Sequence, residues 1–101
     1  YVTNLYPKPT AGVSDQTLTV DATAGGVQFG TAFNKLTRYI VFDVQGADVR
    51  VTYDDSAPTT SNGHILFAGR SYTWSKAAAE KAKFIPDGGT DATIHASEFT
   101  D

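Results

Sequence analysis

The chain contains no cysteine and no methionine, and it has a single tryptophan in 101 residues. Without cysteine it can form neither a disulfide nor a thiolate zinc site, and it has no thiol nucleophile. No apolar run approaches the roughly 18 residues that a membrane-spanning helix needs. We therefore expect no membrane partner, and no chemistry that depends on sulfur.

Charge is also sparse, with 8 basic and 11 acidic residues and a net charge of −3 at pH 7. The basic residues are scattered, whereas a nucleic-acid-binding surface needs a basic stripe, so no nucleic-acid partner is expected. Apolar residues make up 41% of the chain and charged residues 19%, which is far from the composition of disordered proteins. A chain of this length is too short to build two cores, which predicts one domain.

Alternating apolar and polar residues dominate the chain and predict strands. The pattern is clearest at 16–22, 38–45 and 47–53. Gly46 separates the second and third of these segments and suits a tight turn. The sequence therefore predicts a β-hairpin over 38–53.

The C-terminal part predicts a second pair of strands, at 83–86 and 91–99. Between them, residues 87–90 read Asp-Gly-Gly-Thr, which favours a turn. Pro86 cannot donate a backbone hydrogen bond, so it should lie at a strand end or on a sheet edge.

Only one short α-helix is expected, at about 75–83. Ser75 is a good N-cap, and the alanines that follow have the highest helix propensity. So short a helix depends on packing, for which Ala78, Ala82 and Trp74 are the candidates. Several short strands and one small helix predict a mainly β fold, either a single-domain antiparallel β-sandwich or a small β-barrel.

Residues 1–12 differ from the rest and predict an extended N-terminal arm, followed by a single β domain at 13–101. Prolines disrupt a strand ladder here, while the apolar side chains favour burial. Either the arm packs along its own domain or it docks on a neighbouring molecule. In the second case its contact residues are Tyr1, Val2, Leu5, Tyr6, Pro7 and Pro9.

The polar stretch 54–64 is the first place to look for a catalytic or metal site. Asp54, Asp55 and Ser56 follow a predicted strand, which is ordinary turn chemistry. A calcium site would use these carboxylates, but the ligand spacing and closing glutamate of an EF-hand are missing. A triad of Ser56, His64 and Asp54 would lack both the Gly-x-Ser-x-Gly turn and a glycine loop for the oxyanion. We expect a structural loop.

Other candidate sites are equally unsupported. His64 and His95 stand on separate predicted strands without the i, i+4 spacing of helical zinc sites. Aromatic side chains such as Tyr72 and Trp74 could stack on a sugar, although core packing is their commoner use. A carboxylate pair for glycoside hydrolysis would come from Asp43, Asp48, Asp54, Asp55, Asp91 and Glu98. We predict no catalytic residue, metal or cofactor, and hence no enzyme.

Two stretches carry a family resemblance: "DVRVTYDDSAPTTSNGHILFAGRSYTW" (48–74) and "AKFIPDGGTDATIHASEF" (82–99). With their Asp-Ser-x-Pro turn, Gly-His-x-Leu…Ala-Gly segment and Ala-Lys-Phe-Ile strand, they resemble a group of small tailed-bacteriophage virion proteins. Asp55 departs from that pattern, in which glycine is expected. The resemblance implies a capsid decoration or cement protein on the outer surface of the phage head, with the major capsid protein as partner.

Assembly on a lattice would combine many weak contacts into avidity. A homo-oligomer is therefore expected, and three-fold positions on capsids favour a trimer. The alternative function is a β-sandwich binding module for a surface glycan or receptor, in which an exposed Trp74 or Tyr72 would carry the affinity.

Overall fold

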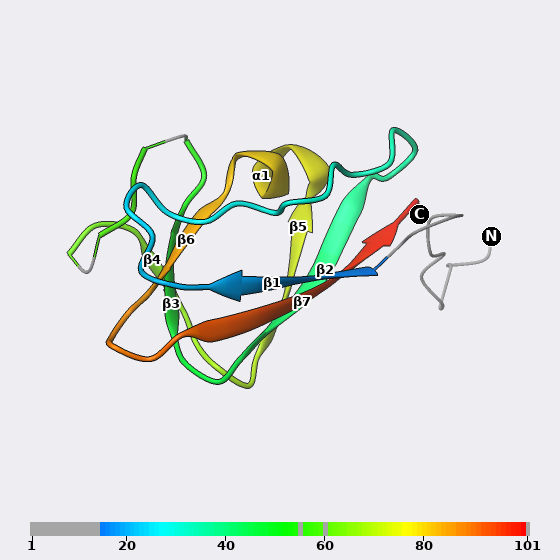
Figure 1. Ribbon diagram of the computed structural model, residues 1–101. Helices are drawn as coiled ribbons and strands as arrows, with labels where there is room; N and C mark the ends of the chain where they lie inside the picture. Colours follow the sequence, from blue (N-terminus) through cyan, green and yellow to red (C-terminus); the bar gives the residue numbers. More distant parts are fainter. Residues whose placement is uncertain (1–14, 55, 60, 101) are drawn as a thin grey trace.

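The computed structural model describes residues 15–54, 56–59 and 61–100. Its strands, in chain order, are β1 (Asp15–Val20), β2 (Tyr39–Gln45), β3 (Val49–Thr52), β4 (His64–Leu66), β5 (Ser71–Ser75), β6 (Lys83–Pro86) and β7 (Ala92–Phe99). They form a four-stranded sheet in the order β1-β7-β2-β5 and a three-stranded sheet in the order β4-β3-β6, and all pairs are antiparallel (Figure 1). The prediction of a mainly β, antiparallel sandwich with one short helix is confirmed. The predicted arm lies outside the described residues.

Alternate residues of each strand point into the space between the sheets, as the period of two requires. In β2 these are Ile40, Phe42 and Val44, all fully buried, and in β3 they are Val49 and Val51. The two sheets share one hydrophobic cluster. The alternation of side chains in the predicted strands 38–45 and 47–53 therefore matches the buried faces of β2 and β3.

The predicted hairpin over 38–53 is wrong. β2 pairs with β5 and β7, whereas β3 pairs with β4 and β6, so the chain passes from one sheet to the other at Gly46. Gly46 does have the positive φ that the prediction required, 88°. The error arises because each strand has one apolar face, and facing each other across the core buries these faces without any edge-to-edge pairing.

The second predicted strand pair is wrong for the same reason. β6 belongs to the three-stranded sheet and β7 to the four-stranded sheet, and the turn residues 87–90 join them across the sandwich. Pro86 is the last residue of β6, which is an edge strand. The predicted place of this proline is confirmed.

The helix α1 (Lys76–Lys81) is shorter than the predicted 75–83, because Ala82 takes an extended conformation and the next residue begins β6. Ser75 is the N-cap, and its hydroxyl accepts a 3.3 Å hydrogen bond from the amide of Ala78. Ala79 and Ala82 are buried against the sandwich, whereas Ala78 is only half-buried. Within the described ranges, no helix is long and apolar enough to cross a membrane.

Candidate functional site

The loop between β3 and β4 forms an open hollow of about 180 Å³. Its lining residues are Thr52, Tyr53, Asp54, Ser56, Asn62 and His64. The serine, histidine and aspartate that sequence reasoning considered as a triad therefore do lie around one hollow. Whether they can react depends on how they contact one another.

Their contacts are those of a turn. The Ser56 hydroxyl donates a 2.6 Å hydrogen bond to Asp54 Oδ1, and the Ser56 amide donates to the same oxygen at 3.1 Å. Both hydrogen bonds lower the pKa of Asp54 below its ordinary value, and the bond from the Ser56 hydroxyl has the larger effect. No hydrogen bond joins His64 to either residue, although a triad needs the histidine between serine and carboxylate. The turn chemistry predicted for Asp54 and Ser56 is confirmed.

The His64 ring is engaged with aromatic neighbours instead. It stacks on Tyr53 with ring centroids 5.3 Å apart and planes 12° apart. Tyr53 in turn meets Trp74 edge-on, at 5.0 Å. His64, Tyr53 and Trp74 thus form an aromatic row at the hollow, and Tyr53 remains 40% exposed.

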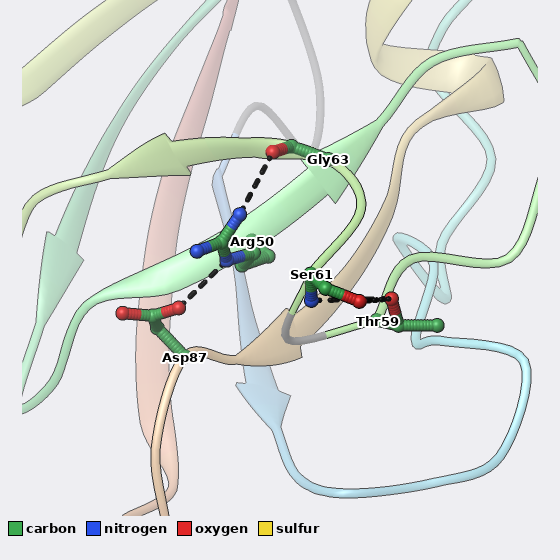
Figure 2. Close-up of polar contacts among 5 residues, drawn as sticks. All are labelled: Arg50, Thr59, Ser61, Gly63 and Asp87. Carbon is green, nitrogen blue, oxygen red and sulfur yellow. Dashed lines mark hydrogen bonds and ion pairs between the residues drawn. The ribbon is translucent and has the colours of Figure 1, made fainter.

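The far part of the loop is fastened to the three-stranded sheet. Arg50, in the middle of β3, donates from Nη1 to the carbonyl oxygen of Gly63 at 3.3 Å and from Nε to Asp87 at 2.7 Å (Figure 2). The Ser61 amide donates to the Thr59 hydroxyl at 3.3 Å within the loop itself (Figure 2). The loop is thus held by polar contacts that are typical of structural connections.

Two of the carboxylates considered for glycoside hydrolysis accept hydrogen bonds from neighbouring loops and so fix their positions. Asp48 Oδ1 accepts a 2.8 Å hydrogen bond from the amide of Ala68, which fixes the connection between β4 and β5. Glu98, 3% exposed, accepts from the amide of Asn34 at 2.8 Å and from the hydroxyl of Thr37 at 2.7 Å. Both carboxylates have structural partners in this fold.

The two histidines belong to different sheets. His64 lies in β4, and His95 lies in β7, where its Nδ1 is 3.3 Å from the Thr17 hydroxyl. Across residues 15–54, 56–59 and 61–100, no three His, Asp or Glu side chains are grouped so as to hold a metal ion.

A second hollow, of about 250 Å³, opens beside β5. Its lining residues are Tyr53, Thr73, Trp74, Ser75 and Ala78. Trp74 is half-buried here because one part of its ring packs edge-on against Phe42, with centroids 4.9 Å apart. Sequence reasoning missed this hollow, since it depends on β5 being an edge strand.

The aromatic residues proposed as a sugar platform are mostly packing residues. Tyr72 lies 5.7 Å from the Phe42 ring, and its hydroxyl accepts a 2.8 Å hydrogen bond from the amide of Phe67. Phe67 itself is 49% exposed, with the Arg70 guanidinium 5.7 Å from its ring centre. The aromatic rings of this region are therefore divided between the core and the surface.

Comparisons with protein families, curated proteins and solved structures found no match for this chain. Its function must therefore be argued from its own residues.

Proposed function

We propose that this chain is a structural virion protein that binds the outside of a phage capsid and stabilises or decorates it through multivalent contacts. The resemblance to small tailed-phage virion proteins motivates the proposal. Residues 48–74 and 82–99, which carry that resemblance, contain β3, β4, β6 and β7 and all but the last residue of β5. They supply the whole three-stranded sheet and half of the other.

The observation that carries the proposal is that the motif residues have structural roles. Asp54 caps its turn through Ser56. A side chain at Gly63 would approach the Val51 carbonyl oxygen to 3.0 Å, so glycine is strongly favoured there. Pro58 is buried against Gly26. Motifs of this kind specify a shape, which suits an assembly component better than a catalyst.

Capsid attachment itself is assigned to the N-terminal arm. Its apolar residues Tyr1, Val2, Leu5 and Tyr6 have the character of interface anchors. One arm offers only a small contact area, so stable attachment requires many copies on a repeating lattice.

The test is co-sedimentation with empty heads assembled from the major capsid protein encoded in the same genome. The full-length chain should pellet with the heads, and a chain of residues 13–101 should stay in the supernatant. Trp74 fluorescence and far-ultraviolet circular dichroism would verify that the shortened chain is folded. A full-length chain that never pellets with heads contradicts the virion role, and a shortened chain that still pellets contradicts the role of the arm.

A second candidate function, binding of a surface glycan, is favoured by the hollow that joins exposed Tyr53 to Asp54 and Asn62. Sugar sites combine an aromatic ring with polar side chains in this way. The stacking of His64 on Tyr53 leaves less of that ring for a ligand. On a glycan array, Tyr53→Ala should abolish binding while Phe67→Ala retains it. An unmodified chain that binds no glycan removes this candidate.

A further inference from the structure

Among the described residues the two sheets present four edge strands, and three of them carry features that disfavour further pairing. β6 ends at Pro86, and its Phe84 exchanges backbone hydrogen bonds of 2.7 and 2.8 Å with Val27. β1 begins with the charged Asp15, and the side chain of its Gln16 exchanges hydrogen bonds of 3.0 and 3.3 Å with the backbone of Thr31. β4 is only three residues long.

The remaining edge strand, β5, has none of these protective features. It is five residues long, reads Ser-Tyr-Thr-Trp-Ser without charge or proline, and pairs only with β2 among the strands that the structure describes. An uncharged, regular edge of this kind is a template for pairing with another strand.

The hydrogen-bond phase shows which groups of β5 are available. Val44 donates to the Arg70 carbonyl at 3.2 Å, and Lys76 donates to the Arg38 carbonyl at 3.0 Å. Bonded pairs alternate along an antiparallel ladder, so Tyr72 and Trp74 also bond β2. The N–H and C=O groups of Thr73, which lies between them, therefore point away from the sheet.

A hollow lies beside this edge and would receive a side chain from an added strand. Trp74 and Tyr53 form its aromatic wall, and Ala78 of α1 contributes a small side chain. Its volume of about 250 Å³ has room for one large apolar side chain. An open ladder and an apolar hollow together make a site for an extended apolar segment.

The sequence offers such a segment before β1. Residues 1–6 read Tyr-Val-Thr-Asn-Leu-Tyr, which are mostly good strand formers, and Pro7 ends the stretch. Six residues are enough to pair along all five residues of β5. Alternation of their side chains places apolar residues on both faces, so either register brings one toward the hollow.

The sheet register shows how far the start of β1 lies from the edge strand β5. Asp15 pairs with Ser97, Ser97 with Val41, and Val41 with Thr73, so one row crosses the sheet from the start of β1 to the middle of β5. The two edges are three strand spacings apart, roughly 14 Å. Residues 7–14 connect the segment to β1 and can span this distance at roughly 3.3 Å per residue, so reach alone permits pairing within one chain or between two. Pro7 and Pro9 favour a second copy, because each proline restricts the backbone to extended conformations and so disfavours folding this connection back across its own sheet.

We propose that the open edge of β5 in one copy binds residues 1–6 of a second copy as an added strand, with one of their apolar side chains in the hollow beside Trp74. Such a contact joins one edge to a different segment and so links chains head to tail. It goes beyond capsid binding, because it operates between copies of this chain in the absence of any capsid. It uses one face of the segment, which leaves the apolar side chains of the other face for the capsid.

The first experiment measures the mass of the isolated protein by light scattering after size exclusion. The full-length chain should be an oligomer of its 10.8 kDa unit, and a chain of residues 13–101 should be a monomer. Thr73→Pro should also be monomeric, because it removes an outward N–H without removing a bond to β2. Thr73→Val is the matched control, since it keeps that N–H and should remain an oligomer. Loss of the oligomer should also shift the emission of Trp74 to longer wavelength.

The second experiment uses the absence of cysteine in the natural chain. One preparation carries Asn4→Cys and the other Thr73→Cys, and the two are mixed and oxidised. A disulfide between the two preparations should form, and it should be lost when the first preparation also carries Leu5→Asp and Tyr6→Asp. Neither experiment uses capsid heads, so a negative result in either one does not contradict the proposed capsid role.

Three results would overturn the proposal. A full-length chain that is monomeric at every concentration shows that no strand is exchanged. An oligomer that survives the loss of residues 1–12 but not Thr73→Pro shows that β5 pairs with another β5. In a third preparation that carries both Asn4→Cys and Thr73→Cys in one chain, a disulfide that closes within the monomer shows that the segment pairs within its own chain.

Discussion

Gly63 and Gly69 both have positive φ angles, but only Gly63 is pressed against other atoms. Gly63 precedes β4 with φ 120°, and an added Cβ would lie 3.0 Å from the carbonyl oxygen of Val51. Gly69, with φ 83°, has nothing within 4 Å of such an atom. An L-residue at positive φ costs about 1 to 2 kcal/mol. Because Val51 is fully buried in the central strand β3, its carbonyl cannot move aside, which adds about 1 to 3 kcal/mol for the overlap.

We therefore expect Gly69→Ala to lower the free energy of unfolding by about 1 kcal/mol and Gly63→Ala by about 3 kcal/mol. Urea unfolding followed by Trp74 fluorescence measures both, since this is the single tryptophan. If the free energy of unfolding falls by about 1 kcal/mol per molar urea, the urea midpoint should fall by about 1 M for Gly69→Ala and by about 3 M for Gly63→Ala. Equal midpoints for the two variants would refute the claim that the Val51 carbonyl, beyond φ alone, requires glycine at position 63.

Three smaller predictions concern polar contacts. Ser75→Ala removes the N-cap of α1 and should cost about 1 kcal/mol in urea unfolding, whereas Ser71→Ala, on the same strand, should cost almost nothing. Asp87→Asn breaks the 2.7 Å ion pair with the arginine of β3 and should cost about 1 kcal/mol, with the loss reduced at high salt. The pKa of Asp54 is lowered by Ser56, so this contribution to stability is present above the unfolded value of 3.8 and is lost as the pH falls through the lowered pKa. A carbon-13 titration should show that Ser56→Ala raises the pKa of Asp54, and an unchanged pKa would contradict the assignment of the cause.

The sequence predicted the faces of the strands correctly and their partners incorrectly. Alternation places Phe42 and Val44 on one side of β2, and Val49 and Val51 on one side of β3, whatever the strands pair with. A short connection around Gly46 suits a hairpin and a crossing between sheets equally well. Only the combined packing of the seven strands that the structure describes distinguishes the two, and single-segment patterns do not contain that information.

For the candidate site, local chemistry was predictable and long-range placement was not. The cap formed by Asp54 and Ser56 spans two residues, so its turn is visible in the sequence. The meeting of Tyr53 with Trp74 joins β5 to the loop after β3, and it depends on the order of strands. The packing of Phe29 against Phe84, with centroids 5.6 Å apart, likewise comes from a segment in which no strand was predicted.

The open edge of β5 bears on how many copies assemble. Each chain would supply one segment of residues 1–6 and one acceptor edge, so an open chain of copies always ends with one edge unfilled. An unfilled, uncharged edge favours aggregation, whereas a closed ring fills every edge. Ring closure therefore gives a physical reason for a defined homo-oligomer, and the rotation between neighbouring copies decides whether that ring contains the three copies expected from capsid symmetry.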